Sequence, residues 1–139
     1  MITTSVLFND QAFTNRPDSL RVIVAGGNRS AIEVLSRRIE SLRSVVGKYI
    51  EVGMTDSYGE TVAAIQDHSP HFVFVDIDGL TTDSCSLAEE CGVLTNIVFF
   101  ASKQRESSRA ARALGGVDFI CLASNNLNAR LASILDLSA

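Results

Sequence analysis

The chain has 139 residues and a mass of 15.0 kDa, which is the size of a single domain. Its composition, 46% hydrophobic and 20% charged, excludes wholesale disorder, and its net charge of −4 argues against a dedicated nucleic-acid-binding surface. The N-terminus shows no secretory signal, the apolar runs are too short to span a bilayer, and the 3 cysteines show no metal spacing. These features predict a cytoplasmic protein that is not an enzyme and holds no metal or cofactor. Residues 1–19 are polar and mixed, so we expect an N-terminal extension followed by one domain at residues 20–139.

The first strand and helix follow this extension directly. Residues 20–25 form a short apolar, β-branched run that ends at two glycines, Gly26 and Gly27, as a buried strand should. Either Asn28 or Ser30 can cap the next helix. Apolar residues in that helix recur at helical spacing as far as Leu42.

The next strand and helix have clear boundaries. Residues 49–54 predict a second strand. Ser57, followed three residues later by Glu60, is a capping box that opens a helix through Gln66. A continuous apolar strand then occupies residues 72–75.

The second half of the chain repeats the alternation. A short helix is expected around residues 87–90, a strand at 97–101 and a helix at about 103–114. Residues 119–122 predict the last strand, and Asn126 can cap a final helix with one apolar stripe.

Five apolar strands that alternate with five helices predict an α/β domain built on a doubly wound parallel sheet. Right-handed crossovers favour the strand order 2-1-3-4-5. Ligands of such sheets bind at the carboxyl ends of the strands. Function is therefore expected at the edge formed by residues 25–28, 76–79, 101–103 and 123–125.

One carboxylate stands out at this edge. Asp76 follows the apolar residues 72–75 and closes the third strand. Because a carboxylate cannot be fully buried without a partner, we expect Asp76 to point out of the edge toward solvent or an ion. The plainer interpretation is that Asp76 caps the following loop, as aspartates at strand ends often do.

Several segments of the chain share the pattern of one known family. They are Arg21–Ala25, Ile50–Gly53 with Gly59 and Glu60 after it, Pro70–Ile77 and Ala113–Asp118. Through these segments the stretch from Leu20 to Leu137 resembles the receiver domain of two-component response regulators of the NarL/FixJ type. The resemblance implies a flavodoxin-like, CheY-like fold.

The resemblance also implies a phosphorylation site, but most of its residues are replaced. In a receiver, an aspartate that ends strand three accepts a phosphoryl group, two acidic residues hold Mg²⁺, and a hydroxyl and a lysine contact the phosphoryl oxygens. Here only Asp76 matches, as the equivalent of the phosphoacceptor. The acidic pair falls on Gly26 and Gly27, the hydroxyl on Ala101 and the lysine on Ala123. Receivers also carry an aromatic residue in strand five that takes part in the switch, and Ile120 stands at that position.

A single retained position predicts an atypical receiver, or pseudo-receiver, that is not phosphorylated in the conventional way. We expect it to act in a bacterial two-component-type response regulator through a protein partner or a homodimer. It would control transcription only through a DNA-binding domain that is absent from this chain.

Two alternatives stay open. The turn from Gly26 to Ser30 opens a helix directly after a strand, so its backbone N–H groups could bind a nucleotide or another anion with Arg29 and Ser30. A Gly-Gly turn also follows simply from tight strand-to-helix geometry. The second alternative is a receiver that is still phosphorylated at Asp76.

A candidate interface lies on the last two helices. Arg105, Arg109 and Arg112 form one basic stripe on the helix expected at residues 103–114. Such a stripe is either a solvated face or a contact for an acidic partner or a second copy. Arg130 and Leu137, on the final helix, could extend this contact.

Overall fold

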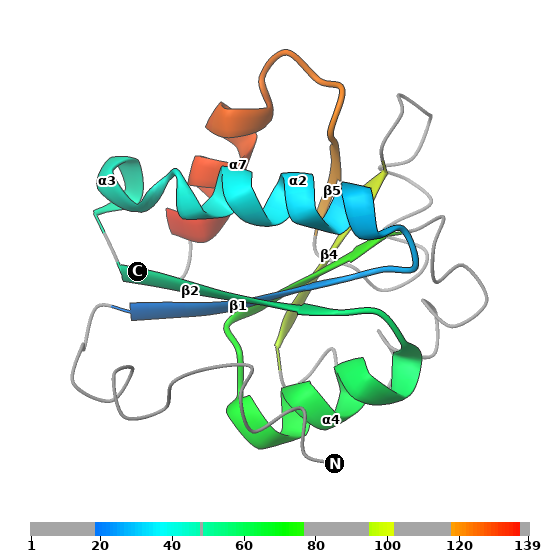
Figure 1. Ribbon diagram of the computed structural model, residues 1–139. Coiled ribbons are helices and arrows are strands. Elements are labelled where there is room, and N and C mark those ends of the chain that lie inside the picture. Colours follow the sequence, from blue (N-terminus) through cyan, green and yellow to red (C-terminus); the bar gives the residue numbers. More distant parts are fainter. Residues whose placement is uncertain (1–18, 48, 77–94, 102–117, 137–139) are drawn as a thin grey trace.

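Five strands form one parallel sheet in the order β2-β1-β3-β4-β5, which confirms the predicted doubly wound topology (Figure 1). The computed structural model describes residues 19–47, 49–76, 95–101 and 118–136. The helices expected around residues 87–90 and 103–114 lie outside these ranges. The strands are β1 (Ser19–Ala25), β2 (Tyr49–Thr55), β3 (Phe72–Asp76), β4 (Asn96–Ala101) and β5 (Asp118–Cys121).

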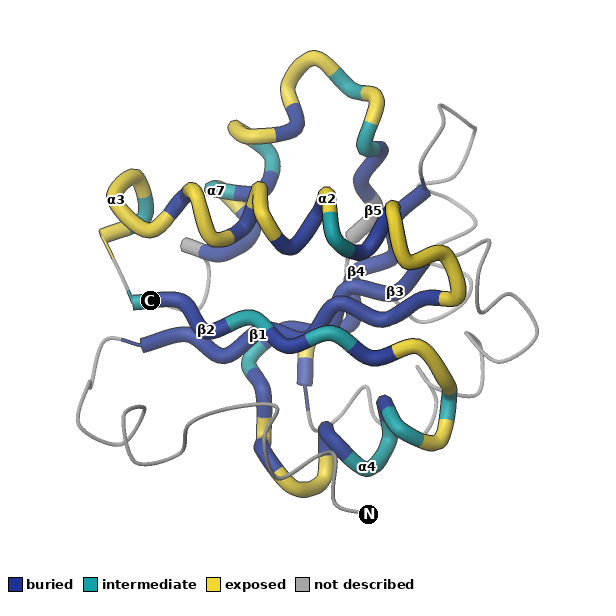
Figure 2. The backbone as a smooth tube through the Cα atoms, viewed as in Figure 1, coloured by how far each residue is buried: buried dark blue, intermediate teal, exposed yellow. Residues whose placement is uncertain are grey.

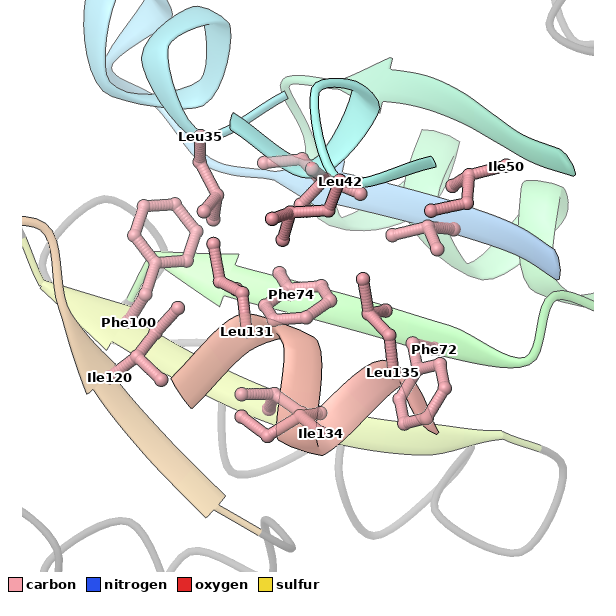
Figure 3. Packing of buried hydrophobic residues seen from close by; sticks show 14 of the residues in the cluster. Leu35, Leu42, Ile50, Phe72, Phe74, Phe100, Ile120, Leu131, Ile134 and Leu135 are labelled. Carbon is pink, nitrogen blue, oxygen red and sulfur yellow. The ribbon is translucent and has the colours of Figure 1, made fainter. Parts of the chain in front are cut away.

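Both faces of the sheet are covered by helices, and this explains why the central strands are apolar without alternation. On one face, Val22, Val24 and Phe74 pack with residues of α2 (Arg29–Glu40) and α7 (Leu127–Asp136) (Figure 3). On the other face, Ile23 and Val73 pack with residues of α4 (Tyr58–His68). Figure 1 shows α2 and α7 on one side of the sheet and α4 on the other. Successive residues of one strand therefore enter opposite cores.

The first helix is shorter than predicted. The side chain of Asn28, not Ser30, caps α2 by accepting a hydrogen bond from the Ala31 N–H at 3.2 Å. The helix ends at Glu40 rather than continuing through Leu42, and the Ser41 hydroxyl donates to the Arg38 carbonyl at 2.7 Å.

A separate short helix, α3 (Arg43–Val46), follows this break. The Arg43 guanidinium donates from Nε and Nη2 to the Ile50 carbonyl, at 3.0 and 2.7 Å, and lies 5.1 Å from the centre of the Tyr49 ring. These contacts tie α3 to the edge strand β2 and favour a new helix over a continuation of α2. The chain then turns at Gly47, whose φ of 76° lies in the left-handed region that glycine tolerates best.

The predicted capping box opens α4. The Ser57 hydroxyl accepts a hydrogen bond from the Glu60 N–H at 3.2 Å, and the Glu60 carboxylate accepts one from the Asp56 N–H at 3.0 Å. In a standard capping box the glutamate accepts from the N–H of the capping residue itself, whereas here it accepts from the residue before Ser57. The helix ends at His68, two residues later than expected, where Ser69 adopts a left-handed conformation with φ of 49°.

Candidate functional site

The carboxyl edge of the sheet brings the predicted site positions together. Asp76 ends β3 and pairs in register with Phe100 of β4, next to Ala101. The end of β1 continues into Gly26, whose N–H donates to the Thr55 carbonyl at 3.1 Å. Gly26 and Asp76 therefore meet at the end of neighbouring strands, as the topology predicted.

The side chain of Asp76 does not point to solvent, so that part of the expectation was wrong. Asp76 is only 2% exposed, and the tube of Figure 2 is buried along the whole of β3. By strand alternation it faces the same side as Phe72 and Phe74, toward the layer that contains α2. It takes part in a hydrogen bond or electrostatic interaction, as a buried carboxylate must. The burial of Asp76 could not be predicted from its position in the sequence, because it depends on β3 staying paired with its neighbours up to its last residue.

Gly26 lies directly against Asp76. A Cβ atom built on Gly26 would stand 2.7 Å from the Asp76 Cβ, 3.1 Å from the Ile32 Cγ2 and 3.4 Å from the Asp76 Oδ2. Among the glycines of the described residues, only Gly47 has a positive φ, so Gly26 is not needed there for a left-handed turn. The missing side chain instead allows β3 and the start of α2 to approach the end of β1.

The remaining receiver-equivalent positions offer no reactive groups. Ala101 is buried at the end of β4, and Ile120 lies in the core on the α2 and α7 face. Ala123 is exposed in the turn that follows β5. In the ranges that the structure describes, no group of three histidine, cysteine, aspartate or glutamate residues could hold a metal ion.

The turn at the start of α2 is exposed from Gly27 to Ser30. Its Asn28 side chain occupies the capping position. Arg29 donates from Nε to the Glu33 carboxylate at 3.2 Å, within the same helix. An anion at this turn would therefore compete with Glu33 for the arginine.

The candidate interface is described only in part. Arg130 is half-buried on α7, and its backbone N–H donates to the Asn126 carbonyl at 3.0 Å. The basic stripe of Arg105, Arg109 and Arg112 and the apolar Leu137 lie outside the described residues.

None of the helices in the described part of the chain is long and apolar enough to span a membrane.

A buried polar cluster at the opposite, amino-terminal edge was not anticipated from the sequence. Arg21 of β1 is paired in register with Glu51 of β2, and its Nη2 lies 3.3 Å from the Glu51 Oε1. Its Nη1 donates to the His68 carbonyl at the end of α4, at 3.2 Å. Arg21, Glu51 and His68 are each less than 9% exposed. The signal available in the sequence was one charged residue within each of two otherwise apolar strands, Arg21 in β1 and Glu51 in β2.

The strand order and the helices on both faces of the sheet define the class of fold. It is the fold of the receiver domains of NarL/LuxR-family response regulators.

Particular solved structures carry this likeness across most of the chain. The signal receiver domain of the response regulator NarL from Mycobacterium tuberculosis matches with a TM-score of 0.66 at 18% identity, over 88% of this chain and 98% of that chain. A DNA-binding response regulator of the LuxR family from Staphylococcus aureus matches with a TM-score of 0.60 at 12% identity, over 86% and 99%. The receiver domain of a Luxo repressor protein from Vibrio parahaemolyticus gives 0.58 at 13%, over 86% and 97%. No protein-family profile matches the sequence, and no curated protein does.

Proposed function

We propose that this chain is an atypical receiver domain, or pseudo-receiver, of a bacterial two-component-type response regulator. The receiver begins with β1 at Ser19 and extends to residue 139, and the residues before it are an extension. The domain works in the cytoplasm by binding a protein partner or a second copy. It controls transcription through a DNA-binding domain outside this chain, and Mg²⁺-dependent phosphorylation is not its signal.

The burial of Asp76 beside Gly26 is the observation that supports the proposal. Asp76 is 2% exposed, and Gly26 stands against it where the resemblance would place an acidic residue. Mg²⁺ is usually bound through one or two carboxylates together with waters and phosphate oxygens. Beside Asp76, Gly26 supplies no second carboxylate for such a shell, and the burial of Asp76 limits the access of a metal ion or a phosphodonor to it.

The missing partners of a phosphoryl group support the same conclusion. A receiver-type switch needs a hydroxyl and a cation that move toward the new charge. Ala101 and Ala123 stand at these positions and can donate no side-chain hydrogen bond. Even a phosphorylated Asp76 would lack the groups that convert its charge into a movement of the domain.

Labelling with a phosphodonor tests the absence of phosphorylation. The chain is incubated with Mg²⁺ and a small acyl phosphate, alongside a conventional receiver as a positive control, and intact masses are measured. We expect the conventional receiver to gain one phosphoryl group and this chain to gain none. Stoichiometric labelling that disappears in Asp76→Asn would show that the chain is a functional receiver.

Sedimentation velocity over a range of concentrations tests self-association. We expect a concentration-dependent dimer that is weakened when Arg105 and Arg109 are both replaced by glutamate, because charge reversal removes the attraction for an acidic surface. Arg29→Glu, at the start of α2, is the matched control and should leave the dimer intact. A chain that sediments as a monomer at every concentration would exclude the homodimer.

A further inference from the structure

His71 joins the start of β3 to β1 through both its ring and its backbone. Its Nδ1 accepts a hydrogen bond from the Arg21 backbone N–H at 3.0 Å, and its own backbone N–H donates to the Arg21 carbonyl at 2.8 Å. Its carbonyl accepts from the backbone N–H and the side-chain amide of Asn96, at 3.3 and 3.1 Å. The residue therefore lies at the point where β1, β3 and β4 begin to pair.

The ring contact selects one protonation state of the imidazole. A neutral imidazole has one nitrogen that accepts and one that donates, whereas the imidazolium donates from both. Because Nδ1 accepts from Arg21, it carries no proton, and the hydrogen lies on Nε2. A proton on Nδ1 would place two N–H donors opposite each other.

The surroundings leave the Arg21 N–H little access to a replacement acceptor. Arg21 is 4% exposed and His71 is half-buried, so water has limited access to their contact. The charged and titratable groups of the described elements at this edge are the Arg21 guanidinium from β1, the Glu51 carboxylate from β2 and His68 from α4. Glu51 is the carboxylate among these groups, and its Oε1 already lies against the Arg21 guanidinium.

We propose that His71 is a proton-sensitive tie between β1 and β3. Protonation of its ring breaks the contact with the Arg21 N–H and places a cation beside a residue whose own side chain is cationic. The start of β3 then loosens from β1, together with the end of α4 that Arg21 holds through the His68 carbonyl. Neutral pH restores the tie. This response to pH does not depend on whether Asp76 is phosphorylated.

Thermal unfolding at about pH 7.5 and about pH 5.5, on either side of the ordinary histidine pKa, provides the first test. The wild-type chain is compared with His71→Asn, whose side-chain oxygen can accept the same hydrogen bond but does not titrate. We expect the wild-type Tm to fall by about 3–5 °C more than that of His71→Asn, the shift that loss of one buried hydrogen bond gives in a domain of this size. Acid effects on carboxylates are common to both chains and cancel in the difference.

His68→Asn is the matched control, because the chain contains only 2 histidines. Because His68 is itself buried, this variant removes any acid sensitivity of that imidazole, and it should keep the part that belongs to His71. An equal fall in Tm for wild type and His71→Asn, or a loss of the sensitivity in His68→Asn instead, would overturn the proposal.

Imidazole ¹⁵N spectra of the wild-type chain give a test that needs no variant to fold. At pH 7.5 we expect the Nδ1 of His71 to show the shift of an unprotonated, hydrogen-bonded nitrogen. Hydrogen exchange at the Arg21 amide, corrected for the intrinsic pH dependence, should accelerate on acidification to pH 5.5. A proton on Nδ1 at pH 7.5, or an unchanged corrected exchange rate, would contradict the proposal.

Discussion

Replacing Arg21 by methionine is expected to lower the free energy of unfolding by about 3–5 kcal/mol. The substitution keeps most of the side-chain volume but removes the cation that lies 3.3 Å from the Glu51 carboxylate. Glu51 is 8% exposed, so its charge would remain buried without the guanidinium. The His68 carbonyl would also lose the donor that joins the end of α4 to β1. Urea denaturation at pH 7 measures the change.

A second substitution separates the charge effect from packing. Arg21→Met combined with Glu51→Leu removes both charges, and we expect it to recover most of the lost stability, because a buried ion pair contributes little beyond a well-packed apolar pair. Arg29→Ala breaks the exposed pair with Glu33 and should change the free energy by about 0.5 kcal/mol or less. An Arg21→Met variant as stable as Arg29→Ala would show that the buried cluster does not stabilise the fold.

Gly26→Ala is expected to destabilise the protein by about 1–3 kcal/mol, the usual effect of inserting a methyl group into a packed site. The new Cβ would stand 2.7 Å from the Asp76 Cβ, and Ile32 closes the other side at 3.1 Å. The crowding atom is the first side-chain carbon of β3, so relief requires movement of that strand's backbone rather than rotation of a flexible side chain. Thermal or urea unfolding of the two chains gives the difference.

Gly59→Ala is the matched control for this substitution. Gly59 is exposed in α4, and a Cβ there would meet nothing within 4 Å. Alanine should therefore stabilise the helix by about 0.5–1 kcal/mol. Similar effects of the two substitutions would mean that the end of β3 is not packed against Gly26.

The contact between Gly26 and Asp76 also limits how substitutions could convert this edge of the sheet into a conventional magnesium-binding receiver site. An acidic residue at position 26 needs more room than alanine, so it can be accommodated only if Asp76 moves. Restoring one carboxylate of the acidic pair therefore does not by itself create a magnesium site. A change at position 26 and the position of the buried Asp76 side chain therefore depend on each other.

Much of the fold could be predicted from local patterns. Apart from Arg21, residues 20–25 and 72–75 are apolar on both faces, and only a sheet covered by helices on both sides buries them completely. The Ser57 and Glu60 capping box placed the start of α4 correctly, because capping depends on neighbours within one turn. The break between α2 and α3 was missed, since it depends on the contact of Arg43 with Ile50 across a turn.

By itself, the amino-acid sequence determined the strands, the order in which they pair and the edge at which Asp76 lies, because these follow from apolar periodicity and the right-handedness of crossovers. Only the tertiary structure decided that Asp76 is buried against Gly26 and that Arg21 contacts both Glu51 and His71. These contacts join residues 30 or 50 positions apart. They depend on strand register and on the distance between neighbouring backbones, which no local pattern of residues specifies.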